Sequence, residues 1–234
     1  MQQLPLAIQL PVRARLESFH AGTNAAITAE LRGVLMSQQA RMMYLAGGIG
    51  CGKTHLLQAA CVWFSEQQWG YTQYIPLREY HNLGVELLEG IEQAPLICLD
   101  DIESIAGNTA WEQAVVRLVN DVMARNGKLI ITGRDTPNHL DLLLLPDLRS
   151  RLLWGGVFHI VPLPPHEQAA VLVLRAQERG LQLTEDVARY LVNLGRGLSY
   201  WIAWLEELDR QSLIAKKKVS MSFVKQVLAQ GKMA

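Results

Sequence analysis

The sequence predicts an α/β fold, a three-layer domain around a parallel sheet, followed by a small all-helical domain. Apolar, strand-like runs alternate with helical patterns through the first two thirds of the chain. Such alternation favours right-handed crossovers and a parallel sheet covered on both faces. After the proline-rich stretch 162–165 only helical patterns remain. We therefore expect a tail at 1–12, the α/β domain at 13–162 and the helical domain at 163–234.

The expected elements follow from the period of the apolar residues. A helix is predicted over 24–37, where apolar residues recur on one face, and a strand over 41–46. A helix begins at residue 54, and a strand over 72–76 and a short helix over 83–90 come next.

The second half of the α/β domain contains two buried strands. Residues 95–99 form a continuous apolar run that ends in acids, a pattern typical of a central parallel strand. A helix over 109–126 and a strand over 128–132 follow. The helical domain is expected to contain four helices, with Thr184 and Ser220 as N-caps of the second and fourth. Their ranges are 165–179, 184–194, 199–215 and 220–229.

Composition limits the function classes. Half of the 234 residues are hydrophobic and 19% are charged, so the chain can bury a proper core. Lys plus Arg and Asp plus Glu both total 22, which argues against a protein whose main task is gripping duplex DNA. The three cysteines lack metal-site spacing and indicate reduced thiols. No signal peptide or apolar run of about 20 residues is visible, so we expect a cytoplasmic protein without membrane partners.

Residues 47–54 follow the phosphate-loop pattern of Gly, four residues, then Gly-Lys-Thr. Glycines let the backbone curl so that N–H groups face one anion, and the following helix directs its positive end there. Lys53 would reach the β- and γ-phosphates, and the Thr54 hydroxyl would ligate Mg²⁺. Within the loop we expect Cys51 to pack, although neighbouring amides could lower its pKa. The expected nucleotide-binding residues are Gly47, Gly48, Ile49, Gly50, Cys51, Gly52, Lys53, Thr54 and His55.

Two acids follow the apolar strand at 95–99, about 50 residues after the loop. Asp100 would hold Mg²⁺ together with Thr54, and Asp101 would polarise or orient the attacking water. The alternative is that two acids merely end a strand.

Arg149 and Arg151 flank a serine near the end of the α/β domain. Two arginines in such a position ordinarily form ion pairs at the surface. In a nucleotide-dependent assembly, an arginine here can instead reach a neighbour's γ-phosphate and stabilise transition-state charge.

Together these motifs resemble the AAA+ ATPases, and specifically the family of the bacterial initiator DnaA. The resemblance runs from about Phe19 to the end of the helical domain. It implies a P-loop AAA+ domain with a helical lid, ADP or ATP with Mg²⁺ as cofactors, and Arg151 as a catalytic arginine finger in trans. The matching residues are Gly47–Thr54 with His55-Leu56-Leu57, Leu99-Asp100-Asp101-Ile102, Ile131-Thr132, and Ser150-Arg151-Leu152 with Trp154-Gly155.

The two sensor regions depart from the family pattern. Initiators read Thr-Ser-Asp-Arg after the fourth strand, whereas this chain continues from Thr132 as Gly-Arg-Asp. Ser199 stands where initiators place a sensor arginine, and Arg196 lies nearby on a different helical face. We therefore expect nucleotide binding with weak or no hydrolysis of the protein's own nucleotide.

The N-terminal residues 3–8 resemble the short peptide by which bacterial replication proteins bind the sliding clamp. Gln3 would donate side-chain hydrogen bonds at a pocket rim, while Leu4, Leu6 and Ile8 would enter apolar pockets. Proline limits the entropy lost on docking. The alternative is a disordered tail.

The resemblance implies a compact DnaA-related regulator that lacks the initiator's duplex-binding and helicase-loading regions. Bound to a clamp on DNA, the ADP form would stimulate ATP hydrolysis by DnaA and so inactivate the initiator. The expected partners are DnaA and the clamp, with a homodimer left open and no sequence-specific DNA binding. Two alternatives remain: an autonomous ATPase of the helicase-loader or transposition type, and an initiator fragment that forms DNA filaments.

Overall fold

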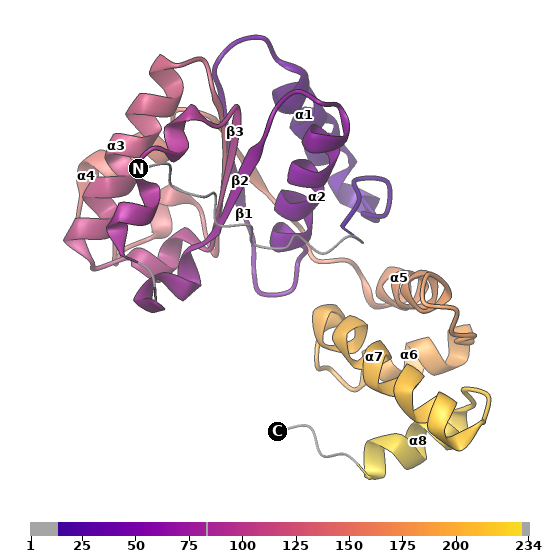
Figure 1. Cartoon of the computed structure of the whole chain (residues 1–234). Coiled ribbons are helices and arrows are strands. Elements are labelled where there is room, and N and C mark those ends of the chain that lie inside the picture. Colours follow the sequence, from indigo (N-terminus) through magenta and orange to yellow (C-terminus); the bar gives the residue numbers. More distant parts are fainter. Residues whose placement is uncertain (1–13, 83, 231–234) are drawn as a thin grey trace. The chain divides into compact units, whose positions relative to one another are not determined.

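The computed structural model describes residues 14–82 and 84–230, and it confirms the expected fold class (Figure 1). The chain divides into two compact units, with the boundary between Val161 and Pro162. The first unit contains a five-stranded sheet with helices, and the described part of the second unit is helical. Among the described residues, no helix has both the length and the apolar character needed to cross a bilayer.

The sheet is parallel throughout and has the strand order β2-β3-β4-β1-β5. Ala46 at the end of β1 lies opposite Gly133 of β4, and Leu99 of β3 lies opposite Ile131. The carboxyl ends of these three strands therefore meet at one edge, where the loop after β1 and the acids after β3 come together. The strands are β1 (Arg41–Ala46), β2 (Thr72–Pro76), β3 (Leu96–Asp100), β4 (Lys128–Gly133) and β5 (Gly156–His159).

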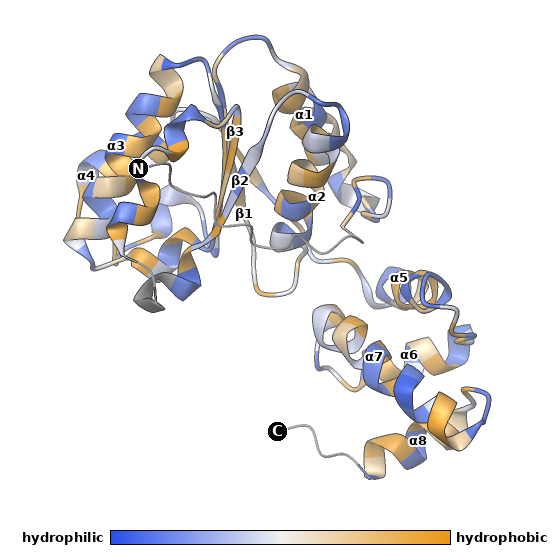
Figure 2. Ribbon diagram, viewed as in Figure 1, coloured by the Kyte–Doolittle hydropathy of each residue, from blue (hydrophilic) through white to orange (hydrophobic). Residues whose placement is uncertain are grey.

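Helices cover both faces of the sheet. Figure 1 shows α1 (Ala25–Met36) and α2 (Lys53–Glu66) on one face, and α3 (Thr109–Ala124) and α4 (Pro146–Leu152) on the other. Successive strand residues point to opposite faces. Thus Met43 of β1 packs in the cluster of α1 and α2, while Tyr44 packs in the cluster of α3 and α4. In Figure 2, β3 is mostly hydrophobic, β2 is mostly pale blue, and the helices show both colours.

The predicted helix over 83–90 is wrong. The described residues there form short 3₁₀ turns, η3 (Val85–Leu88) and η4 (Ile91–Gln93), after η2 (Leu77–Asn82). Gly90 has a φ angle of +81°, which ends the helical path between the two later turns. The remaining 3₁₀ turns are η1 (Gly22–Asn24), η5 (Ile102–Ile105) and η6 (Pro137–His139).

The second unit packs around its own core, in which Trp201 and Leu205 are fully buried. Its helices begin and end within two residues of the predicted ranges. Ser220 caps the last helix through a bond from the Phe223 N–H, whereas Thr184 stands at an N-cap position without a side-chain bond. The helices are α5 (Pro165–Gln177), α6 (Glu185–Asn193), α7 (Leu198–Ala215) and α8 (Met221–Ala229).

Candidate functional site

The glycine-rich loop between β1 and α2 is shaped by positions that suit only glycine. Gly50 and Gly52 have φ angles of +77° and +103°, where L side chains are strained. A Cβ on Gly52 would also lie 2.9 Å from the Phe19 ring, and one on Gly47 would lie 2.6 Å from the Cys51 sulfur. Larger residues at Gly47 and Gly52 would therefore clash with their neighbours and displace the loop.

Lys53, the first residue of α2, directs its ammonium group into this loop. Nζ donates to the carbonyl oxygens of Gly47 at 2.6 Å and Gly48 at 3.1 Å, and the residue is only 7% exposed. A buried ammonium group needs such acceptors. Thr54 follows in the same first helical turn and is half-buried. Both side chains thus belong to a helix N-terminus, where N–H groups and the helix dipole favour an anion.

The segment before α1 packs against the outside of the loop. Phe19 stacks on the His55 ring with centroids 6.0 Å apart, and His55 Nε2 lies 3.3 Å from the Arg15 carbonyl oxygen. Ile49 at the loop tip is 89% exposed. Burial raises the pKa of the Cys51 thiol above its usual value, which favours the packing interpretation of Cys51 over a reactive thiolate.

Asp100 ends β3 with a fully buried carboxylate. The Tyr74 hydroxyl of β2 donates to Oδ2 at 2.8 Å, and the Thr132 hydroxyl of β4 donates to Oδ1 at 2.5 Å. Burial, followed by the charge of Asp100, raises the pKa of Tyr74, so its hydroxyl stays protonated at neutral pH. Thr132 also accepts the backbone N–H of Asp101 at 2.9 Å. The expected sensor residue Thr132 is thus in direct contact with both acids.

Asp101 turns the chain after β3 with a φ angle of +58°. Its side chain is 20% exposed, and Oδ2 lies 3.9 Å from Nη1 of Arg78. Burial raises the pKa of the Asp101 carboxyl, and the charges of Asp100 and Glu103 act in the same direction, while Arg78 opposes them. A partly exposed carboxylate with a raised pKa is a suitable group to accept a hydrogen bond from water.

The end of β4 departs from the initiator pattern for a packing reason. The Tyr44 hydroxyl donates to the Asp135 carbonyl oxygen at 2.8 Å, and a Cβ on Gly133 would lie 1.8 Å from that hydroxyl. Arg134 turns toward Glu103, with its N–H 3.1 Å from Oε2 and Nε 3.8 Å from Oε1. Gly133 therefore makes room for Tyr44, and Arg134 forms a surface ion pair.

Arg151 on α4 is held by three neighbours. Nε donates to Oδ1 of Asn120 on α3 at 2.9 Å, and the guanidinium carbon lies 5.1 Å from the Trp154 ring centroid. Nη1 lies 3.5 Å from the Asp147 carboxylate. Among the contacts made by the described residues, none uses Nη2. The guanidinium is therefore positioned by its own chain and keeps one N–H edge for another group.

Arg149, the other arginine of the pair, has a different environment. Nη2 donates to the carbonyl oxygens of Leu140 at 3.2 Å and Leu143 at 3.4 Å. Its Nε is buried and has no hydrogen-bond partner in the described chain. Arg149 thus stabilises the segment before α4.

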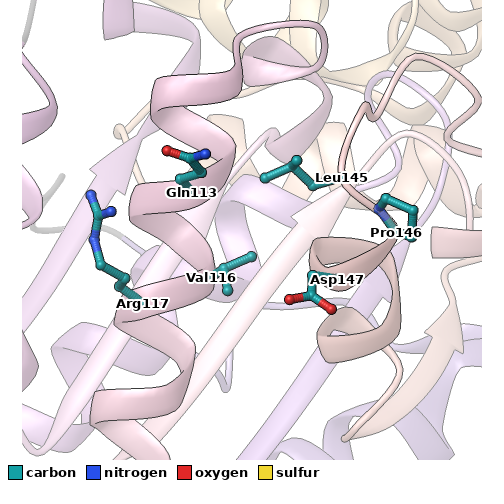
Figure 3. A pocket seen from close by; sticks show the side chains of 6 residues that line it. All are labelled: Gln113, Val116, Arg117, Leu145, Pro146 and Asp147. Atoms are coloured by element: carbon teal, nitrogen blue, oxygen red, sulfur yellow. The ribbon is translucent and has the colours of Figure 1, made fainter.

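A pocket of about 440 Å³ lies between α3 and α4 (Figure 3). In Figure 3 the Asp147 carboxylate points toward the space between the helices, and the Arg117 guanidinium points away from it. Asp147 both pairs with Arg151 and lines the pocket, so the pocket adjoins the arginine. The lining residues are Gln113, Val116, Arg117, Leu145, Pro146 and Asp147.

Ser199 belongs to the second unit, where it is the second residue of α7 and is exposed. Its neighbour Arg196 donates to the Tyr200 hydroxyl at 2.6 Å, and the guanidinium lies 5.0 Å from the Tyr200 ring centroid. Arg196 lies just before α7 and is engaged by Tyr200 in the first turn of that helix.

The residues at the carboxyl edge fit a nucleotide phosphate and Mg²⁺. Loop N–H groups and the Lys53 ammonium are phosphate donors, and the Thr54 hydroxyl and Asp100 carboxylate are oxygen ligands of the kind Mg²⁺ prefers. Within the described residues, no group of three or more His, Cys, Asp or Glu side chains could hold a metal ion. A usual Mg²⁺ site has only one or two protein ligands and is completed by substrate phosphates and water.

Comparison with known proteins places this geometry in a family. Residues 13–159, more than half of the chain, match the family model of the bacterial DnaA ATPase domain. The chain belongs to the DnaA family of AAA+ ATPases. Residues 166–228 match a second model, the lid domain of Hda. The two matches together are those expected of a DnaA-related AAA+ protein of the Hda type.

Solved structures of two DnaA proteins and of RuvB share the fold. Domain III of the Thermotoga maritima replication initiation protein DnaA superposes with a TM-score of 0.79 at 19% identity, over 94% of this chain and 98% of that chain. AMPPCP-bound DnaA from Aquifex aeolicus gives a TM-score of 0.71 at 20% identity, over 86% and 66%. The Thermotoga maritima RuvB branch migration motor gives 0.61 at 17% identity, over 90% and 69%.

Several residues of the DnaA-type site escaped the sequence analysis. Tyr74 and Asn120 each sit on a predicted element, but their polar tips contact residues far away in sequence. Glu112 is fully buried and accepts three backbone N–H groups from the segments before α3 and α4. The sequence shows only a polar side chain at a position where an apolar one is expected. This does not identify the residue that the side chain contacts.

The chain's own nucleotide hydrolysis is expected to be slow, well below roughly 1–10 s⁻¹ for an ordinary enzyme. Ser199 has no guanidinium for the γ-phosphate, and Arg134 is paired with Glu103. Phosphate release by the purified protein with ATP and Mg²⁺ measures this. Turnover at the rate of a motor ATPase would favour the autonomous-ATPase alternative.

Proposed function

We propose that this chain is a nucleotide-binding regulator of bacterial replication initiation, which binds the sliding clamp and stimulates ATP hydrolysis by DnaA. The observation that carries the proposal is the pairing of a DnaA ATPase-domain match with an Hda lid-domain match in one chain. The regulator lowers the amount of the ATP form of the initiator.

The bound ligand is ADP or ATP with Mg²⁺. Loop residues 47–52 and Lys53 bind the phosphates, and Thr54 and Asp100 bind the ion. The ion neutralises phosphate charge when it is bound. Support comes from the buried ammonium of Lys53 inside the loop and from the AMPPCP-bound state of the similar Aquifex aeolicus DnaA.

Arg151 acts on the nucleotide of DnaA rather than on the chain's own. A guanidinium is always charged and meets phosphate oxygens with a planar fork. The contacts with Asn120, Asp147 and Trp154 limit the rotamers of Arg151, so less entropy is lost when it meets a phosphate.

The clamp-binding peptide at Gln3, Leu4, Leu6 and Ile8 lies outside the described residues. Deleting residues 1–8, or changing Leu4 and Leu6 to Ala, is expected to abolish clamp binding without lowering the melting temperature. The reason is that apolar side chains in pockets supply the binding free energy of such peptides. Co-elution with purified clamp measures binding, and thermal unfolding measures stability. Clamp binding by the deletion variant would eliminate the peptide from the proposal.

The test of the proposed function is the rate of ATP hydrolysis by DnaA from the same organism, with and without this protein on clamp-loaded DNA. We expect acceleration. An unchanged rate, with the protein shown to be folded and clamp-bound, would contradict the proposal.

A further inference from the structure

The carboxylate of Asp100 is fixed from two neighbouring strands. Tyr74 of β2 donates to one oxygen at 2.8 Å, and Thr132 of β4 donates to the other at 2.5 Å. All three residues are less than 8% exposed. Rotation of the carboxylate about its Cβ–Cγ bond would break both bonds, so the two hydroxyls hold it in one orientation.

Tyr74 also packs beside the helix that carries Thr54. It belongs to the apolar cluster that includes Leu57 and Cys61 of α2. Tyr74 thus lies next to α2 while its hydroxyl is bonded to Asp100. Thr54 and Asp100 are the two residues expected to bind Mg²⁺.

We propose that Tyr74 is a positioning residue for Mg²⁺ in the nucleotide complex. Its hydroxyl orients the Asp100 carboxylate so that the acceptor sites left open by Tyr74 and Thr132 are available to the ion or to its water. The inference rests on the proposed function, because it takes Asp100 as the group that serves Mg²⁺. Groups that orient a metal ligand typically change metal affinity 10- to 100-fold when they are replaced.

The decisive variant is Tyr74→Phe in the full chain, which removes one hydroxyl and keeps the ring. ADP affinity is measured by calorimetry in excess Mg²⁺ and again in EDTA. The ratio of the two affinities is the Mg²⁺ contribution. We expect the ratio to fall about tenfold, while the affinity in EDTA stays within about twofold because the loop and Lys53 are unchanged.

The chain offers a matched control in Tyr44→Phe. Tyr44 is also buried in a sheet strand, and its hydroxyl also makes one 2.8 Å bond, but to the Asp135 backbone. Both variants should lower the unfolding midpoint by a similar amount, and only Tyr74→Phe should change the Mg²⁺ ratio. Thr132→Val should lower the ratio as well, and Thr132→Ser, which keeps the hydroxyl, should restore it.

A double-mutant cycle with Asp100→Asn separates positioning from a general effect. If Tyr74 acts through Asp100, Tyr74→Phe adds no further loss in the Asp100→Asn background. Additive losses would overturn the proposal, and so would an unchanged ratio or an equal loss of affinity in Mg²⁺ and EDTA. These measurements need neither DnaA nor clamp, so their failure is distinct from a failure to stimulate DnaA.

Discussion

Lys53→Ala is expected to lower the affinity for ADP roughly 100-fold or more. Each hydrogen bond to a charged group contributes about 1.5–3 kcal/mol, and Lys53 would exchange its bonds to Gly47 and Gly48 for phosphate oxygens. Isothermal titration of ADP in Mg²⁺ measures the loss.

The matched control for this prediction is Lys128→Ala. Lys128 is 9% exposed, close to the 7% of Lys53, but it begins β4 and therefore lies at the opposite end of that strand from Gly133. Burial lowers the pKa of Lys128, and its ammonium lies 5.5 Å from the Phe64 ring centroid. Its loss should affect stability and leave ADP affinity unchanged. Equal losses of affinity in the two variants would mean that Lys53 has no special role at the phosphates.

Arg151→Ala is expected to remove stimulation of DnaA while leaving ADP and clamp binding intact. An arginine supplied in trans contributes about 10³–10⁵ in rate in known nucleotide hydrolases. Arg151→Lys should not restore stimulation, because lysine lacks the planar fork. The rate of DnaA ATP hydrolysis on clamp-loaded DNA measures the effect. The Arg151 side chain is 20% exposed and that of Asp147 is 72% exposed, so their ion pair contributes about 0–1 kcal/mol. The bond to Asn120 contributes about 0.5–1.5 kcal/mol, and the fold should tolerate losses of this size.

Arg149→Ala gives the contrasting result. Its guanidinium holds two carbonyl oxygens before α4, so the variant should unfold at a lower temperature. At equal concentrations of folded protein it should still stimulate DnaA. If Arg149→Ala abolishes stimulation and Arg151→Ala does not, Arg149 is the finger. If neither variant matters, the trans-arginine mechanism is wrong for this chain.

Local patterns predicted most of the fold because the strands are short apolar runs and the helices are amphipathic. The strands over 41–46, 72–76 and 128–132 agree with β1, β2 and β4 to within one residue. The sequence pattern does not predict β5, because this strand has four residues and is only half-buried at its centre. The helix predicted over 83–90 was wrong, because the segment contains apolar residues but ends at Gly90, whose φ angle is +81°.

In the candidate site, too, local features could be predicted from the sequence and long-range contacts could not. The loop residues and the two acids were found because they are contiguous in sequence. Their partners were not, because Tyr74 and Asp100 are 26 residues apart and Asn120 and Arg151 are 31 apart. Register between parallel strands decides the first contact, and helix packing decides the second. Neither strand register nor helix packing can be predicted from the local spacing of apolar residues.

The most direct test of whether this chain stimulates DnaA is one assay that measures how fast DnaA-bound ATP is converted to ADP. It contains DnaA, this protein with ADP, sliding clamp and DNA, and each component is omitted in turn. We expect rapid conversion only in the complete mixture, and a return to the slow intrinsic rate of DnaA when this protein, the clamp or the DNA is left out. Equally fast conversion without DnaA would mean that the chain hydrolyses ATP by itself. Slow conversion in the complete mixture would mean that it does not act on DnaA. Either result would contradict the proposed function.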